Sequence, residues 1–226
     1  MREIQTISFG GVNCYLLTTD KGFVLIDTGF SKNRVDVERE LNSAGCTPET
    51  LKIILLTHGD FDHSGNAAYL REKYNAKIAM HIDDEGMVEK GDLFYNRNAN
   101  FLMRMMGKII LFFLRGGLKK EARFTPDLLI DESYDPTEFG LDATVVFIPG
   151  HSKGSIGILS STGDLFCGDL LENTKKPAKN SLIADKKAFY ESVEKLKGLK
   201  ISTVYPGHGE PFLMEQFIKN QKLSED

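Results

Sequence analysis

Apolar and polar residues alternate with a period of two at the start of the chain. Residues 4–9, 12–18 and 23–27 follow this pattern and are predicted to form three strands. Glycine-containing turns at residues 10–11 and 20–22 separate them. Because these turns are short, we expect the three strands to pair antiparallel at the beginning of a sheet.

The pattern then changes to a helical period. Residues 33–44 are predicted to form a helix that stops at Gly45. An apolar run at residues 51–56 is typical of a buried strand, and a second helical stretch follows at residues 67–74. Ser64 is the expected N-cap of that second helix.

The remaining chain keeps the same mixture of short strands and helices. We expect strands at residues 77–80, 128–130, 144–148, 156–160, 165–167 and 203–205, and helices at residues 185–197 and 213–220. Asp185 is the expected N-cap of the first of these helices. The fold class is therefore α/β (α+β), and we expect one domain over residues 1–226.

Residues 91–123 interrupt this pattern and are predicted to form a helical insertion. Their cationic side chains recur at intervals of 7, 4, 7 and 4, which places them on one helical face: Arg97, Arg104, Lys108, Arg115 and Lys119. Three interpretations remain open for the apolar side. It could cover the domain, form a methionine-rich lid over a site, or make a membrane or homodimer contact.

Composition narrows the class of protein. The 226 residues are 41% hydrophobic and carry a net charge of −4, so nucleic acid is not an expected partner. We expect no transmembrane segment and no signal peptide. The three cysteines, Cys14, Cys46 and Cys167, form no C-x-x-C pair and are expected to be small buried residues, which favours a cytoplasmic location.

Candidate metal ligands are concentrated directly after the strand at residues 51–56. His58, Asp60, Asp62 and His63 lie within six positions. Imidazole and carboxylate together suit zinc, iron or manganese. The alternative is a polar turn whose side chains are solvated.

The same residue types follow other predicted strands. Asp27, His151, Asp169 and His208 each lie in a glycine-containing turn after a strand. Open α/β sheets place their sites at the carboxyl ends of strands, so these side chains are expected to converge. His81 also ends a strand, but we expect it to cap a helix or lie at the rim rather than bind metal. Residues 83–85 are expected to form an acidic first turn of a short helix.

Five segments together resemble the metallo-β-lactamase superfamily, and most closely its glyoxalase II-like hydrolase branch. They are Asp27-Thr28-Gly29, the run from Thr57 to Asn66, Gly150-His151-Ser152, Gly168-Asp169 and Gly207-His208-Gly209. The resemblance covers nearly the whole chain except the insertion at about 91–123 and a basic loop that carries Lys175, Lys176 and Lys179. It implies a four-layer αββα sandwich built from two similar halves, with a pair of metal ions at the sheet edges.

The resemblance also implies a ligand set. Metal 1 is expected to be held by His58, Asp60 and His151, and metal 2 by Asp62, His63 and His208. Asp169 is expected to bridge the two ions, and Asp27 to support the histidines from behind. The implied cofactors are two divalent ions, zinc first, with iron or manganese as alternatives.

Asp60 departs from the family pattern H-x-H-x-D-H, because it stands where the second histidine is usual. A carboxylate there would favour harder ions such as iron or manganese. Asp60 could instead contact a ligand residue and not the metal itself. Metal 1 would then bind weakly or not at all.

These residues imply a metal-dependent hydrolase. A metal-bound hydroxide, with Asp62 as catalytic residue, would attack a small carbonyl substrate such as a thioester, ester or lactone. The alternatives are a non-haem di-iron oxidoreductase, a phosphodiesterase or nuclease, and a metal-binding module without catalysis. Substrate-binding residues are unassigned; Lys153 and Tyr205 are candidates, with an ordinary surface role as the alternative.

Overall fold

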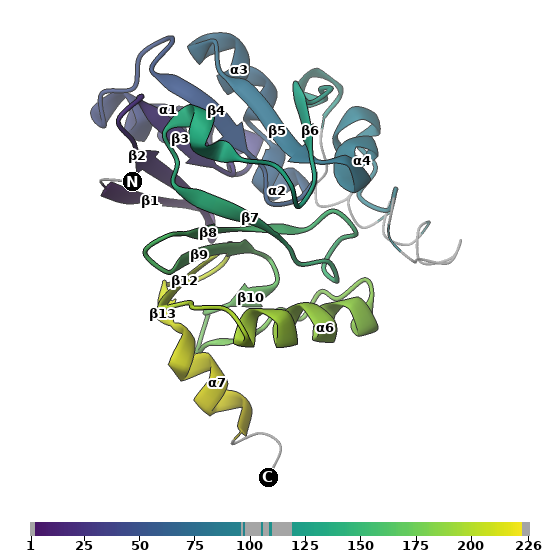
Figure 1. The fold of residues 1–226 in the computed structure, drawn as a ribbon. Coiled ribbons are helices and arrows are strands. Elements are labelled where there is room, and N and C mark those ends of the chain that lie inside the picture. Colours follow the sequence, from purple (N-terminus) through teal and green to yellow (C-terminus); the bar gives the residue numbers. More distant parts are fainter. Residues whose placement is uncertain (1–2, 96, 98–104, 106–108, 110–118, 223–226) are drawn as a thin grey trace.

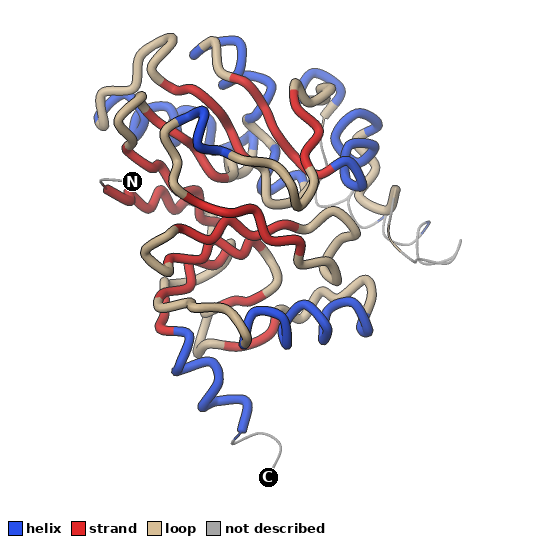
Figure 2. The backbone as a smooth tube through the Cα atoms, viewed as in Figure 1, coloured by secondary structure: helices blue, strands red, loops and turns tan. Residues whose placement is uncertain are grey.

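Two β-sheets stack face to face, and helices cover the outer face of each (Figure 1). This computed structural model describes residues 3–95, 97, 105, 109 and 119–222. Most of the helical insertion predicted at 91–123, with its lid, membrane and homodimer interpretations, lies outside the described residues. Figure 2 shows the strands of the two sheets as adjacent layers, with the helices on their outer sides.

The first sheet contains six strands in sequence order. They are β1 (Glu3–Phe9), β2 (Val12–Thr18), β3 (Phe23–Ile26), β4 (Leu51–Leu55), β5 (Lys77–His81) and β6 (Leu128–Ile130). The first three pair antiparallel through the short turns, as predicted. From β3 onward the strands pair parallel.

The second sheet contains five strands in the order β13-β12-β9-β8-β7. Their bounds are β7 (Ala143–Phe147), β8 (Ile156–Ser160), β9 (Asp164–Gly168), β12 (Thr203–Pro206) and β13 (Phe212–Leu213). A separate hairpin pairs β10 (Leu171–Glu172) with β11 (Ala178–Lys179). The two-residue strands were not predicted, because they are too short to show alternation.

The helices lie between the strands in the sequence. The α-helices are α1 (Arg34–Ser43), α2 (Phe61–Ser64), α3 (Ala67–Tyr74), α4 (Glu85–Lys90), α6 (Lys186–Lys197) and α7 (Met214–Lys222). The 3₁₀ turns are η1 (Ser31–Asn33), η2 (Ile82–Asp84), η3 (Lys120–Ala122) and η4 (Pro136–Phe139). Asp185 caps α6 as predicted, since its carboxylate accepts a hydrogen bond from the Ala188 amide at 3.0 Å.

Three apolar layers hold the sheets and helices together. One lies between the first sheet and its helices, with Leu41 and Leu70 at its centre. The second lies between the two sheets and includes Phe166. The third packs Phe189 of α6 and Phe217 of α7 against the second sheet. The expected four-layer αββα sandwich is therefore confirmed.

The prediction for Ser64, next to the metal-ligand motif, is wrong. Ser64 does not cap α3; it is the last residue of the one-turn helix α2, and its hydroxyl donates to the carbonyl of Asp60 at 2.9 Å. Asn66 precedes α3, and its side chain instead donates to Thr28 and Phe30. The motif is therefore partly helical rather than a loop.

The three cysteines are free thiols and buried, as predicted. Burial raises the pKa of the Cys46 thiol to about 12, so it stays protonated near neutral pH. Among the described helices, none combines the length and apolar character needed to cross a lipid bilayer.

Candidate metal centre

The predicted ligands converge because the strands that carry them end at the same edge of the sandwich. Asp27 directly follows β3, and Asp169 directly follows β9. Glycines leave room where the segments cross. A Cβ on Gly168, whose φ is +49°, would lie 2.5 Å from Thr57 Oγ1. A Cβ on Gly207 would lie 2.3 Å from Asp169 Oδ1, so this glycine is required for space.

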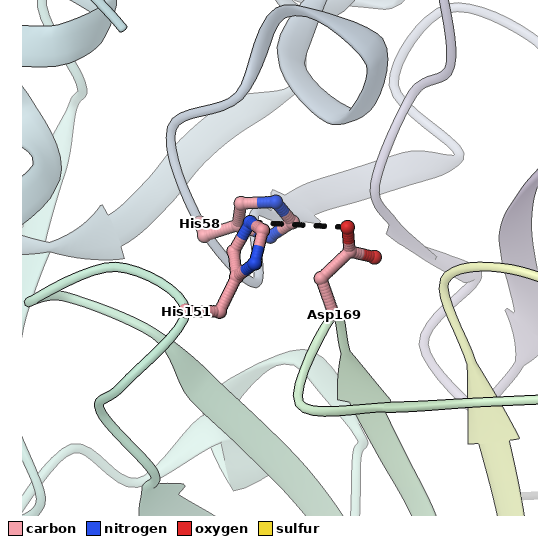
Figure 3. Close-up of side chains that lie close together, drawn as sticks. All are labelled: His58, His151 and Asp169. Atoms are coloured by element: carbon pink, nitrogen blue, oxygen red, sulfur yellow. Dashed lines mark ion pairs between the residues drawn. The ribbon is translucent and has the colours of Figure 1, made fainter. Parts of the chain in front are cut away.

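Two groups of side chains have the spacing of metal ligands. Cluster A consists of His58, His151 and Asp169, and cluster B consists of Asp62, His63 and His208. Within each cluster the ligand atoms lie within 4.8 Å of one another. Figure 3 shows the rings of His58 and His151 next to the carboxylate of Asp169.

Asp169 belongs to cluster A and also reaches two histidines of cluster B. Its Oδ1 is 3.2 Å from His63 Nε2, and its Oδ2 is 3.2 Å from His208 Nε2. Its Oδ2 is also 3.8 Å from His151 Nε2. One carboxylate is therefore positioned to serve both clusters, which is the geometry that a bridging ligand requires.

Each of the four histidines is held through its Nδ1 atom. His151 Nδ1 is 2.7 Å from the Leu182 carbonyl, and His208 Nδ1 is 2.7 Å from the Gly11 carbonyl. A carbonyl only accepts hydrogen bonds, so both Nδ1 atoms must carry the proton. This fixes the tautomer that leaves the Nε2 lone pair of each neutral ring facing the clusters.

Asp27 orients the other two rings. His63 Nδ1 donates to Asp27 Oδ2 at 2.9 Å. His58 Nδ1 reaches the same oxygen through the hydroxyl of Thr57, which lies 2.9 Å from the ring and donates to Asp27 at 2.7 Å. Asp27 lies where the sequence analysis expected it, whereas the role of Thr57 as a link was missed.

The hydrogen bonding of three buried atoms in the clusters indicates whether a cation fits there. His58 Nε2, His63 Nε2 and Asp169 Oδ1 are buried and make no well-aligned hydrogen bond among the described residues, although His63 Nε2 and Asp169 Oδ1 lie 3.2 Å apart. A buried polar atom without a partner costs about 1–3 kcal/mol. A divalent cation would satisfy all three atoms, and a mixed set of imidazoles and carboxylates is the donor chemistry that zinc and iron accept. The residues therefore fit a metal centre.

Asp60 lies beside cluster A rather than in solvent. Its Oδ2 is 3.0 Å from His151 Nε2 and 3.6 Å from His58 Nε2. It also accepts hydrogen bonds from Arg97 Nη2 at 2.8 and 2.7 Å, one to each oxygen. Arg97 was predicted only as part of a basic helical face, and no motif connected it with this site.

Asp84 is a third residue whose role was missed. It was expected in the acidic first turn of a short helix, and the structure shows that it is fully buried. Its carboxylate accepts from the Gly59 amide at 3.0 Å, the Gly154 amide at 2.9 Å and the Ser152 hydroxyl at 2.6 Å. Asp84 therefore joins the loop that carries His58 to the loop that carries His151.

The other candidates lie apart from the two clusters. His81 caps η2 by accepting from the Asp83 amide at 3.2 Å and stacks on Phe147, which confirms its predicted capping role. Tyr205 packs against Tyr15 and Phe166 in the core between the sheets. Lys153 is exposed.

The carboxylates change the protonation of the metal-free site. Burial lowers the pKa of His63, but the carboxylates of Asp169, Asp27 and Asp62 outweigh it and hold that pKa well above its ordinary value. The pKa values of His151 and His208 are also raised, since nearby carboxylates again outweigh burial. Burial raises the pKa of Asp169, but His63 and His208 lower it by more.

Metal binding is therefore expected to release protons. The raised histidine pKa values mean that these rings keep protons at pH values where free histidine would lose them, and a protonated ring cannot bind metal. The apparent metal affinity should rise with pH, by about tenfold per pH unit for each proton displaced, until the folded-state pKa values are passed. Zn²⁺ titration calorimetry of chelator-treated protein in buffers of different ionisation enthalpy measures this release. An affinity independent of pH between 6 and 8 would contradict it.

Comparisons with known proteins agree with this geometry. A sequence model described as "Metallo-beta-lactamase superfamily" matches residues 7–208. The chain is 26% identical over 160 residues to the "Probable metallo-hydrolase YqgX" of Bacillus subtilis, covering 70% of this chain and 65% of that protein. It is 27% identical over 175 residues to the "Hydroxyacylglutathione hydrolase GloC" of Haemophilus influenzae, covering 75% of this chain and 71% of that protein.

A solved structure extends the likeness over almost the whole chain. The crystal structure of TTHA1623 "in a di-iron-bound form" has a TM-score of 0.72 and 25% sequence identity. The match covers 96% of this chain and 97% of that one.

Proposed function

This chain belongs to the metallo-β-lactamase superfamily, and from that premise we propose that it is a metal-dependent hydrolase of a small carbonyl substrate. The proposed substrate class is a thioester, ester or lactone. The observation that carries the proposal is the pair of clusters that Asp169 reaches, with buried ligand atoms that make no well-aligned hydrogen bond in both. The relatives described as a probable metallo-hydrolase and a hydroxyacylglutathione hydrolase support it.

The proposed cofactors are two divalent ions. Cluster A would hold one ion and cluster B the other, with Asp169 shared between them. Zinc suits the four imidazoles, and the di-iron form of the similar structure makes iron the alternative. When bound, such ions supply Lewis acidity, which makes water a nucleophile near neutral pH.

The side chains of this protein have separate tasks in that reaction. The fixed Nδ1 contacts of the four histidines prevent their rings from turning, so the ligand atoms are preorganised. Asp62 Oδ2 lies 3.7 Å from His208 Nε2 and 3.9 Å from His63 Nε2, and the side chain is 18% exposed. Asp62 is therefore accessible from solvent, and we propose that it orients the attacking water and accepts its proton.

The experiment is a substrate panel with the full chain. Protein stripped by a chelator and reloaded with Zn²⁺, Mn²⁺ or Fe²⁺ is assayed with an acylglutathione thioester, an aryl ester, a lactone and bis-p-nitrophenyl phosphate. We expect one carbonyl substrate to be hydrolysed, with activity lost on chelation and regained on reloading. His81→Asn is the matched control, because it changes a histidine outside both clusters and asparagine can still cap η2. The proposal would be overturned if only the phosphodiester were hydrolysed. It would also be overturned if no substrate were hydrolysed with any of the three metals.

A second candidate function is a non-haem di-iron oxidoreductase. Two observations favour it: the di-iron form of the similar structure and the Asp60 carboxylate next to cluster A. It predicts that the isolated protein contains iron and that its visible absorption changes on exposure to O₂. A colourless protein that contains only zinc would exclude it.

A further inference from the structure

The charge distribution differs between the two clusters. The guanidinium of Arg97 lies at cluster A, where its Nη2 is 2.7 Å from Asp60 Oδ2 and 3.1 Å from His151 Nε2. Within the described part of the chain, the ion pairs of Asp62 and Asp169 involve only histidines. Among the described residues, a permanent positive charge is therefore paired with a carboxylate at cluster A, and none is paired with Asp62 of cluster B.

Arg97 is held in this position by several contacts. Its Nε donates to the His151 carbonyl at 3.4 Å, and its Nη1 donates to the Leu93 carbonyl at 3.3 Å. The side chains of Arg97 and Asp60 are only 13% and 9% exposed, so solvent screens the pair poorly. This is a largely buried ion pair rather than a surface contact.

The guanidinium and a metal ion at cluster A would use the same atom. His151 Nε2 is a ligand atom of cluster A, and it is also 3.1 Å from Arg97 Nη2. A zinc–imidazole bond is about 2.0–2.1 Å long, so an ion bound there would lie close to the guanidinium. Arginine keeps its charge at every pH at which the protein is folded, so the repulsion cannot be relieved by loss of a proton.

We infer that Arg97 is a built-in competitor for metal at cluster A, so that the two clusters fill in order, B before A. The inference rests on the proposed function, because it concerns the same metal centre. At cluster B, no described arginine or lysine forms an ion pair with Asp62, so its ion meets no such competitor there. Cluster A fills only at higher metal concentration, when the Arg97–Asp60 pair rearranges and frees the oxygens of Asp60.

The test measures metal binding rather than activity. Chelator-treated full-length protein is titrated with Zn²⁺ by calorimetry, and bound metal is counted by elemental analysis. The wild type should bind one ion tightly and a second at least about tenfold more weakly. His58→Ala should remove the weak step and leave the tight one, which assigns the weak step to cluster A.

Variants that remove the charge of Arg97 give the decisive test. Arg97→Gln should tighten the second step by at least about tenfold and leave the first step unchanged within about twofold. Arg97→Met, whose side chain has no charge and no hydrogen-bond donor, should tighten the second step to a similar degree. Having two variants means that the result does not depend on the folding of either one alone. Arg71→Gln is the matched control, because Arg71 pairs with Asp127 away from the clusters and its loss should change neither step.

Opposite results would overturn the inference. A second affinity that is unchanged or weaker in both Arg97 variants would mean that Arg97 supports metal binding at cluster A instead of opposing it. That result would leave the proposed hydrolase intact if two ions still bind and a carbonyl substrate is still hydrolysed. A wild type that binds no metal at either cluster would instead overturn the proposed function.

Discussion

Asp169→Ala is expected to remove metal from both clusters and to lower hydrolysis by at least about a thousandfold. Asp169 lies 3.2 Å from a histidine nitrogen of cluster B and 3.8 Å from one of cluster A, so its loss affects both. Losing the Lewis acid costs several kcal/mol of barrier lowering, and each 1.4 kcal/mol is about tenfold in rate. Elemental analysis of the purified variant measures the metal, and the substrate panel measures the rate.

An exposed aspartate provides the control for that prediction. Asp142 accepts a hydrogen bond from the Ser161 hydroxyl at 2.6 Å, and it belongs to neither cluster. Asp142→Ala should keep its metal and its activity. If Asp169→Ala retained the metal content of the wild type, the assignment of Asp169 as the shared ligand would be wrong.

Asp27→Asn is expected to weaken metal binding by about 10- to 100-fold and to destabilise the folded protein by about 3 kcal/mol. Asp27 accepts hydrogen bonds from the Thr57 amide, the Thr57 hydroxyl and the His63 ring. An amide cannot accept through its nitrogen, so at least one buried donor loses its partner. Both His58 and His63 would then lose the contact that orients them.

Asparagine is the suitable replacement because the backbone of Asp27 has a φ of 57°, a left-handed conformation that asparagine tolerates. A loss of affinity therefore reports the carboxylate and not backbone strain. Zn²⁺ titration and the free energy of unfolding in urea measure the two effects. Asp83→Asn, an exposed carboxylate, should change neither quantity. An Asp27→Asn variant with wild-type affinity would show that the histidine orientation does not depend on this carboxylate.

Much of the fold was predictable because its elements obey local rules. The spans of β2 and α3 match the predicted ranges 12–18 and 67–74, since alternation and helical period are expressed within single segments. The stop at Gly45, whose φ is +87°, was also predicted from local chemistry. The hairpin of β10 and β11 was missed because two-residue strands depend on tertiary context.

The site was predictable only for residues that carry a recognisable motif. His58, His151 and Asp169 were singled out because each follows a strand in a glycine-containing turn, and the structure gathers them in cluster A. Asp84 carried no such signal, since an acidic residue before a helix is ordinarily solvated. Its burial depends on two loops that are 25 and 70 residues away along the chain.

The sequence by itself determined which residues can bind metal and that they follow strands, because residue type and periodicity are local properties. Only the tertiary structure decided how these residues act together. It gave the distances at which Asp169 of cluster A also reaches cluster B, and it placed Arg97 against Asp60 beside cluster A. The physical reason is that burial and electrostatic interaction depend on distances between segments that are remote in the chain, and no local pattern encodes those distances.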